Sequence, residues 1–390
     1  MRTKLWSLTL GNFAIGTGAM IVPGMLNELT ADLQVTPAAI GVLIFAFAMT
    51  ICFGGPVLAG LTSRIERRTL LTCCLGICAF MHVMAALVPG YTSLLVVRIL
   101  TAVGAALFTS QAAATASLLV PVGERGRAIA LVFLGWSIAA VVGLPLGSWL
   151  GAHLGWRMTI ALVGLVSGLL ATWVWIQVPR GLYVSPMNRQ AWATLLRNKP
   201  LLIAVGVTAV AAAGQFTVLS YLALLLKTYI GATPTVISLM FACFGVAGVT
   251  GNLIGMRFID RIGADRVAMA SMGCMALALG LWPFSTGSTL VTALLIGIWG
   301  LGCFSVTGAQ QARLVGLAPN LATASVALNS SALYLGQAFG ALTGGALIAA
   351  RATDWLATTG MLLMLAAMGL SHFALTRARR ATVDVTIARS

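Results

Sequence analysis

Two charged segments, about half the chain apart, contain side chains whose types and spacing could do chemistry. "GLTSRIERRTL" and "FIDRIGADR" align at an offset of 197 residues, so that Ser63 matches Asp260 and Arg64 matches Arg261. A serine or aspartate at a helix end can accept hydrogen bonds from the free backbone amides of a neighbouring helix, and an arginine can fix the connection beside it. This chemistry joins helices rather than transforming a substrate.

Other polar side chains lie near the middle of segments that are otherwise apolar. Such groups can hydrogen-bond a polar solute, or they can bond to one another between helices, and both interpretations stay open. The candidate substrate-binding residues are Asn12, Thr17, Thr109, Gln111, Gln215, Tyr221, Gln310, Asn329, Tyr334 and Gln337.

Two ionisable side chains, His82 and Arg98, lie deeper in apolar segments than any acid does. A cation inside the membrane is costly and therefore marks a functional candidate, although Arg98 is near enough to a helix end to reach the surface. Only an imidazole changes its charge near neutral pH, so His82 is a candidate for proton coupling, with an ordinary packed histidine as the alternative. The three histidines His82, His153 and His372 are far apart along the chain, and we expect no enzymatic activity, no metal and no cofactor.

The elements that must position these residues are membrane helices. Of the 390 residues, 59% are hydrophobic and 8% are charged, whereas a soluble domain has about 25% charged residues. A helix needs about 20 apolar residues to cross a bilayer. Twelve segments qualify: Trp6 to Leu26, Ala38 to Leu61, Thr69 to Pro89, Ser93 to Leu119, Ala128 to Leu150, Met158 to Val178, Leu201 to Leu226, Val236 to Met256, Val267 to Phe284, Leu290 to Leu314, Ala322 to Ala350 and Trp355 to Leu375.

The basic residues predict the orientation of these helices. With twelve crossings and a cytoplasmic N-terminus, 19 of the 23 lysines and arginines fall on the cytoplasmic side, as the positive-inside rule requires. The net charge of +15 is thus a topological signal. It is spread loop by loop rather than gathered on one surface, so we expect no nucleic-acid partner.

A polar segment divides the chain into halves with six crossings each. We predict an all-α membrane protein with an N-terminal six-helix bundle at 1–178, a cytoplasmic linker at 179–199, a C-terminal six-helix bundle at 200–375 and a cytoplasmic tail at 376–390. The aligned charged segments indicate that the second half repeats the first.

Three motifs resemble those of a known family. "GNLIGMRFIDRIGADR" resembles the loop motif of the major facilitator superfamily, and "RILTAVGAA" resembles its helix-four motif with an intramembrane arginine. "GWSIAAVVGLPLGSWLGAHLGWRMTI" resembles the helix-five motif of the drug/proton antiporter branch, especially bacterial exporters of sugars, amphenicols and purines. The first-half loop, "GLTSRIERRTLL", and His82 resemble the sugar-efflux members in particular.

The resemblance implies two pseudo-symmetric bundles that rock about a central cavity in the bacterial inner membrane, with both termini cytoplasmic. It implies an efflux permease for a small polar or amphiphilic solute of sugar, amphenicol or nucleoside type, acting as a monomer in the lipid bilayer. Gly143, Pro145 and Gly147 would form a packed pivot between the bundles. The residues implied in gating are these three and Ser63, Arg64, Arg68, Arg98, Asp260, Arg261 and Gly263, with Asp260 and Arg261 a stronger latch than the first copy.

The sequence departs from its relatives at the residues that resemblance would assign to proton coupling. The usual acid of helix one is Ala19, and the histidine that close relatives have in helix four is Ala105. Either protons couple through His82 and Arg98, or the protein does not follow the proton antiport of the family. An uncoupled facilitator and a substrate sensor therefore stay as alternatives.

Overall fold

The protein is a bundle of membrane-length helices. The structure, a computed structural model, describes residues 2–183, 189–318 and 321–387, and all regular elements in these ranges are helices. The first six crossings are α1 (Arg2–Gly24), α3 (Pro37–Leu61), α4 (Arg67–Leu87), α5 (Tyr91–Leu118), the joined segments α6 (Arg125–Ile138), η2 (Ala139–Gly143) and α7 (Leu144–Leu154), and α8 (Trp156–Gln177). The last six are α10 (Lys199–Leu219) with α11 (Leu222–Ile230), α12 (Pro234–Ile262), α13 (Ala264–Gly280) with η3 (Trp282–Ser285), α14 (Thr289–Leu317), α15 (Ala322–Ala349) and α16 (Trp355–Ile387).

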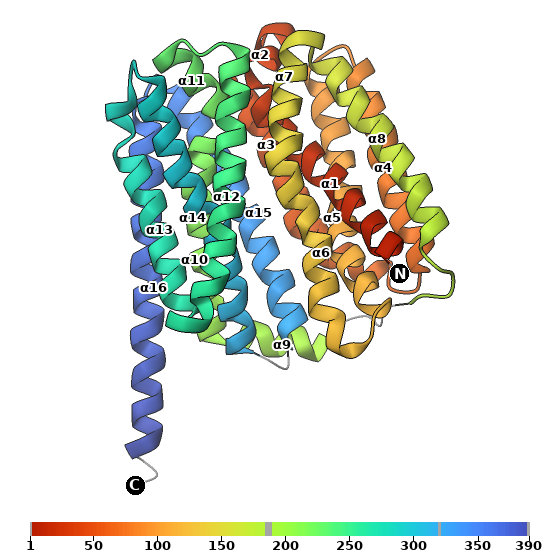
Figure 1. The fold of residues 1–390 in the computed structure, drawn as a ribbon, viewed down its shortest axis with the longest axis vertical. Coiled ribbons are helices and arrows are strands. Elements are labelled where there is room, and N and C mark those ends of the chain that lie inside the picture. Colours follow the sequence, from red (N-terminus) through yellow and green to blue (C-terminus); the bar gives the residue numbers. More distant parts are fainter. Residues whose placement is uncertain (1, 184–188, 319–320, 388–390) are drawn as a thin grey trace.

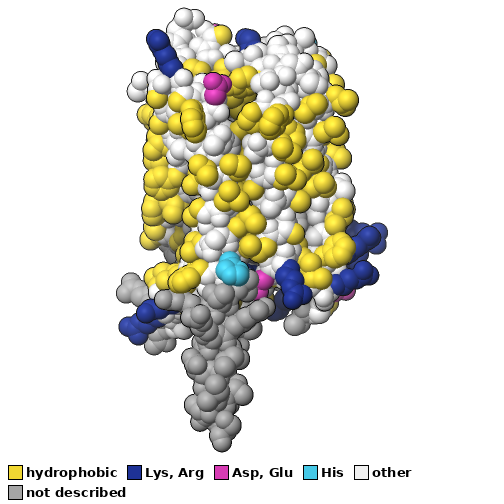
Figure 2. Space-filling model, turned by 90° about the vertical axis from the view of Figure 1, so that its left-hand side faces the viewer, with side chains coloured by type: hydrophobic (Ala, Val, Ile, Leu, Met, Phe, Trp, Pro, Cys, Tyr) yellow, Lys and Arg dark blue, Asp and Glu magenta, His cyan; other side chains and the backbone are white. Residues whose placement is uncertain are grey.

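The twelve predicted crossings are confirmed. Eleven are long and apolar enough to span a membrane by themselves. The remaining crossing, α13, has 17 residues and continues into the short helix η3. Large apolar side chains such as Phe53, Leu87 and Leu290, which are 61%, 69% and 71% exposed, point outward from the crossings. On the face drawn in Figure 2, hydrophobic side chains form a broad belt, and most of the visible cations lie below it, as expected of a helical bundle in lipid.

The two halves form two bundles that stand side by side (Figure 1). The short helix α9 (Arg189–Arg197) lies across one end, which we call the linker end. The helices α2 (Leu26–Leu33) and α11 lie at the other end, which we call the distal end. Because the number of crossings is even, the chain ends where it began, and both termini belong to the linker end.

Hydrophobic packing joins the bundles at the distal end. One buried cluster lies within the first bundle and includes Phe47, Leu71 and Phe108. A second cluster contains most of the core of the second bundle and extends into the first. Its first-bundle members, such as Met25 and Leu144, come from the distal halves of their helices.

The distal end also shows that the two halves are repeats. The short helices α2 and α11 end at Gln34 and Gly231, which both have left-handed backbone conformations with φ of 53° and 59°. Thr36 and Thr233 then cap α3 and α12, each helix beginning with a proline. Both pairs have the offset of 197 residues that the charged segments showed. Thr-Pro is a typical helix start, and this second sign of the repeat was missing from our sequence interpretation.

The linker end differs from the sequence prediction in three places. Asp260 and Arg261, expected in a loop, lie in the last turn of α12, and Gly263 with φ of 89° separates α12 from α13. The expected linker contains α9, and α16 continues as a helix through the expected tail to Ile387. Residues 184–188 of the linker and 388–390 of the tail lie outside the described ranges.

Candidate functional site

The seam between the bundles is closed at the distal end by Tyr221. This residue lies between α10 and α11, has no exposed surface, and donates its hydroxyl to the carbonyl oxygen of Ala341 on α15 at 2.6 Å. Its hydroxyl lies against Gly41 of α3 and Gly345 of α15, and a Cβ atom at either glycine would collide with it. Tyr221 was predicted to bind substrate, which stays a prediction; in this conformation it packs in the distal seam.

A second part of the distal seam joins the η2–α7 crossing to α12. The Ser238 hydroxyl donates to the carbonyl oxygen of Pro145 at 2.7 Å. Closer to mid-depth, Gly245 packs so tightly on the backbone of Ala140 and Val141 that a side chain would not fit. Pro145 has no N–H to offer to Val141, and the helix just before it widens into the π-helical turn η2. The irregular backbone of this crossing therefore faces the other bundle.

The predicted pivot glycines pack closely on a helix of their own bundle. Gly143 packs on Thr17 and Gly147 packs on Ile21, both on α1 of the same bundle. Pro145 accepts a hydrogen bond at the seam, and the tightly packed glycine found there, Gly245, comes from α12. The role of Gly143, Pro145 and Gly147 as a pivot stays a prediction.

Several predicted binding residues hold helices of one bundle together. In the first bundle, Thr109 on α5 donates to Asn12 Oδ1 at 2.7 Å, and Asn12 Nδ2 donates to the carbonyl oxygen of Val132 at 3.0 Å. Thr17 is buried against Gly143, and its hydroxyl has no hydrogen-bond partner among the described residues. Asn12 and Thr109 therefore satisfy one another, as buried polar groups in lipid must.

The second bundle has a similar internal network. Thr208 on α10 donates to Asn329 Oδ1 on α15 at 2.6 Å, and Gln310 Nε2 on α14 reaches the Thr208 hydroxyl at 3.2 Å and the Ala204 carbonyl oxygen at 3.0 Å. Gln310 Oε1 is buried without a partner among the described residues. The network ties α10, α14 and α15 together.

Gln215 was predicted, with Tyr221, to face the cavity. Its Nε2 lies 2.9 Å from Cys303 Sγ, so its amide joins α10 to α14. It is 9% exposed and therefore nearly buried in this conformation.

The polar residues that remain at the seam belong to α15. Gln337 is 7% exposed and makes no hydrogen bond to any residue that the structure describes. Tyr334, one turn closer to the linker end, packs against the buried cluster of the first bundle although it belongs to the second. Phe339, on the same helix, meets Phe45 of α3 edge to face, with ring centroids 6.5 Å apart. Tyr334 and Gln337 thus offer a hydroxyl and an unpaired amide where the bundles meet.

His82 and Arg98 lie together inside the first bundle. Arg98 Nη1 donates to the carbonyl oxygen of Gly18 at 3.0 Å, and its guanidinium lies 4.4 Å from the ring centre of Phe47. His82 Nδ1 lies 2.6 Å from the Cys78 carbonyl oxygen, which can only accept, so Nδ1 bears the proton. His82 Nε2 lies against Gly18 and makes no hydrogen bond to a described residue. The pair fastens α4 and α5 to α1.

At the linker end of the first bundle, the buried residue Arg67 connects helices, although Arg64 and Arg68 were the residues predicted to act there. Its Nη1 donates to Gln111 Oε1 on α5 at 2.7 Å, so Gln111 belongs to this end rather than to mid-depth. Arg67 also donates to the Ser63 carbonyl oxygen at 3.1 Å. Arg64 is exposed, and Arg68 lies 4.0 Å from the ring centre of Trp175.

The same segment fastens the start of the linker. Glu66 Oε1 accepts from the Gly181 amide at 2.7 Å, and the Arg67 amide donates to the Leu182 carbonyl oxygen at 2.9 Å. Glu66 and Arg67 therefore hold the start of the linker against the beginning of α4.

The second bundle has an ion pair at the equivalent junction, formed by residues other than Asp260 and Arg261. Arg313 Nε on α14 lies 2.7 Å from Asp265 Oδ1 on α13, and Arg313 Nη1 donates to the Ser371 hydroxyl on α16 at 2.9 Å. Asp260 and Arg261 are exposed, and neither has an ion pair or hydrogen bond to a described residue. Arg67 and Arg313 each adjoin the end of a crossing, so in the sequence they resemble the other cytoplasmic cations, and only the fold reveals that both are buried.

All eight acids lie away from the middle of the crossings. They are placed in α2, in connections, or in the first or last turn of a helix: Glu28, Asp32, Glu66, Glu124, Asp260, Asp265, Asp354 and Asp384. Among the described residues, no group of three or more histidines, cysteines or acids could hold a metal ion.

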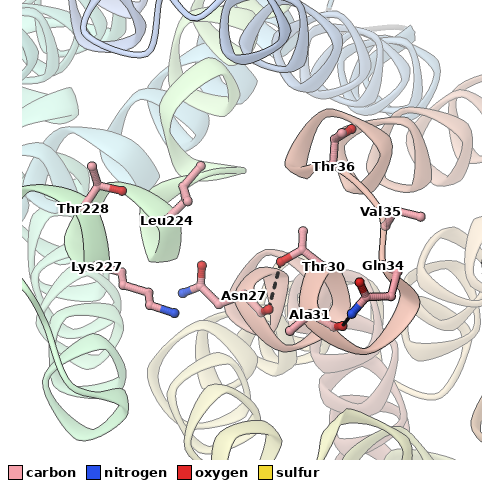
Figure 3. A pocket seen from close by; sticks show the side chains of 9 residues that line it. All are labelled: Asn27, Thr30, Ala31, Gln34, Val35, Thr36, Leu224, Lys227 and Thr228. Atoms are coloured by element: carbon pink, nitrogen blue, oxygen red, sulfur yellow. Dashed lines mark hydrogen bonds between the residues drawn. The ribbon is translucent and has the colours of Figure 1, made fainter.

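A pocket of about 770 Å³ opens at the distal end, between α2 of one bundle and α11 of the other (Figure 3). Asn27 crosses this gap, donating to the Ala223 carbonyl oxygen at 3.2 Å. The pocket is lined by Asn27, Thr30, Ala31, Gln34, Val35, Thr36, Leu224, Lys227 and Thr228. Lys227 is the charged member of this set, and Figure 3 shows its side chain extending toward α2.

Comparisons with known proteins cover nearly the whole chain. The family model described as Major Facilitator Superfamily matches residues 8–224 and 204–387. The inner membrane transport protein YdhP of Escherichia coli K12 is 29% identical over 89% of each chain. A probable sugar efflux transporter of Helicobacter pylori J99 is 28% identical over 94% of this chain and 93% of the relative. The solved D-xylose-proton symporter has the same fold, with a TM-score of 0.78 at 18% identity over 94% of this chain and 96% of that one.

Proposed function

Because this chain belongs to the Major Facilitator Superfamily, we propose that it is a secondary transporter that exports a small polar or amphiphilic solute across the bacterial inner membrane. The proposed solutes are of sugar, amphenicol or nucleoside type. The name of the Helicobacter relative, a probable sugar efflux transporter, favours a sugar or a molecule like it.

The observation that supports alternating access is the uneven contact between the bundles. The described hydrogen bonds that cross between bundles, from Asn27 and from Ser238, lie in the distal half. The unpaired amide of Gln337 and the hydroxyl of Tyr334 lie nearer the linker end, beyond these contacts. We therefore propose that this conformation is shut at the distal end and receives its solute from the linker end.

The basic residues supply the proposed orientation. With the linker end in the cytoplasm, the cation-rich side in Figure 2 faces inward, as the positive-inside rule requires. The distal pocket then faces the periplasm. The bundle boundaries at 178 and 200 and a monomeric state belong to the same proposal.

The charge of the solute and the proton coupling are proposed from the positions of the ionisable side chains. None of the acids lies at mid-depth, so a neutral or anionic solute is favoured over a strictly cationic one. His82 and Arg98 are the proposed route for protons, and they lie between helices of the first bundle rather than at the seam. An uncoupled facilitator is the second candidate, and the absence of a mid-depth acid favours it.

The test uses purified protein in liposomes, screened with sugars, amphenicols and nucleosides, with and without a pH gradient. We expect saturable flux of one solute class, accelerated by solute on the opposite side. Gln337→Ala is expected to raise the KM of that solute about tenfold, the effect of losing one well-placed hydrogen bond, while the melting temperature is unchanged. Asn329→Ala is the matched control, because Asn329 bonds to Thr208 of the same bundle. Its main effect should be a lower melting temperature. Binding without flux would refute the transporter and favour the sensor.

A further inference from the structure

Glu28 is an acid that is half-buried on the short helix α2. It lies on α2, and its Oε2 atom is buried and makes no hydrogen bond to any described residue. The preceding residue, Asn27, forms the hydrogen bond to Ala223 that joins the two bundles. The carboxyl thus lies where the first bundle meets α11 of the second.

The repeat shows how unusual this acid is. α2 and α11 are equivalent in the two halves, as their end residues Gln34 and Gly231 indicate. At the offset of 197 residues, Glu28 corresponds to Leu225, which is 1% exposed. One half therefore fills this position with a buried leucine, and the other half fills it with a carboxyl group.

The charged groups around Glu28 do not form an ion pair with it in the structure. α11 contributes Lys227 and Tyr229, and the Tyr229 hydroxyl is already bonded to Asp354. On α2 itself, Asp32 pairs with Arg157 of α8 at 2.6 Å. α8 contacts α2 through Arg157 and Trp156, which both bond to Asp32. α3 also packs on α2, and its ionisable side chain is Cys52; the cations of α1, Arg2 and Lys4, lie at the linker end of that helix.

Burial therefore controls the protonation of this group. Burial raises the pKa of the Glu28 carboxyl above its ordinary value of 4.5, while its own backbone amide and the Lys227 cation lower it by less. When the bundles separate at the distal end, water reaches the carboxyl and this burial is lost. Protonation thus favours the closed distal end, and this preference disappears as the pH rises through the raised pKa.

We propose that Glu28 is a proton-binding site that makes closure of the distal end depend on pH, because it binds a proton more readily while α2 packs on α11 than after they part. In the proposed orientation, Glu28 responds to the pH of the periplasm. This inference rests on the proposed alternating-access cycle, because the closed and separated states are steps of that cycle.

The test measures conformation without any solute. Spin labels on genetically encoded amino acids at the exposed positions Ala31 and Thr228 report the distance between α2 and α11 in full-length protein in lipid nanodiscs. We expect the ratio of short to long distances to fall with rising pH, by up to about tenfold per pH unit for one proton, with a midpoint above 4.5. Glu28→Gln should keep the short distance across the whole range.

Two further variants make the result specific. Asp32→Asn removes the neighbouring acid of α2 and should leave the midpoint unchanged. Lys227→Gln removes the cation that favours ionised Glu28 and should move the midpoint to higher pH. This variant tests the proposal even if Glu28→Gln does not fold. A wild-type midpoint that persists in Glu28→Gln, or distances that ignore pH, would overturn the proposal. If solute flux is measured in liposomes while the distances do not depend on pH, the proposed transport function is retained and only the pH dependence of closure is refuted.

Discussion

At the scale of single residues, the helix junctions of the linker end place a buried arginine on different helices in the two bundles. In the first bundle the arginine, Arg67, lies at the start of α4 and its partner, Gln111, is on α5. In the second bundle the acid, Asp265, is at the start of α13 and the arginine, Arg313, is on α14. The repeat keeps the junction, but the cation moves from one helix to the other.

The ion pair at the second junction leads to a prediction about stability. Asp265→Asn leaves Arg313, whose side chain is 6% exposed, without its anion. Because Asp265 is itself 38% exposed, we expect a loss of about 1 to 2 kcal/mol rather than the larger cost of a fully buried pair. Asp260→Asn, which removes an exposed acid five residues earlier, is the control and should leave the melting temperature unchanged. Equal losses would contradict the pairing described here.

At the scale of elements, the distal seam depends on helices that approach closely. Gly41 on α3 and Gly345 on α15 leave room for the Tyr221 ring and hydroxyl. The opposite contact, between α12 and the η2–α7 crossing, depends on Gly245 and on the carbonyl oxygen of Pro145. Glycines let two helix backbones approach closely, which supplies most of the packing energy between helices in lipid.

Gly41→Ala should prevent closure of the distal seam. Its Cβ atom would overlap the Tyr221 hydroxyl, so we expect flux in liposomes to fall at least about tenfold, equivalent to 1.4 kcal/mol or more against the closed state. Gly60→Ala on the same helix has free space around its Cβ atom and controls for the gain in helix propensity.

Removal of the hydroxyl tests the cause of this effect. Tyr221→Phe in the Gly41→Ala background takes away the colliding oxygen and should restore part of the flux. If the double variant is as slow as Gly41→Ala, the collision is not what blocks closure.

At the scale of the whole molecule, the sides of the membrane can be tested directly. Alkaline phosphatase fused after Gly231, in the distal connection between α11 and α12, should be active because this end faces the periplasm. The same enzyme fused after Gly263, between α12 and α13, should be inactive. Measured activity in whole bacteria decides between the two orientations, and the reverse pattern would place the termini outside.

The overall fold was more predictable than its contacts. Apolar length and basic loops are local properties of the sequence, and they were enough for twelve crossings in two halves. The partner of a glycine or a cation depends on tertiary packing, so the sequence could not show that Gly143 packs on α1 or that Arg313 holds Asp265. The helices α2 and α11 were missed as separate elements because each directly continues an apolar crossing.

The offset of 197 residues has an evolutionary consequence. It relates Thr36 to Thr233 and Gln34 to Gly231, which is best explained by an ancestral gene that encoded one half and was copied in tandem. After that event the copies diverged, and one has Glu28 where the other has Leu225. A chimera made of two identical first halves would have a glutamate at both of these positions, and so two acids at the distal end where the protein has one acid and one buried leucine.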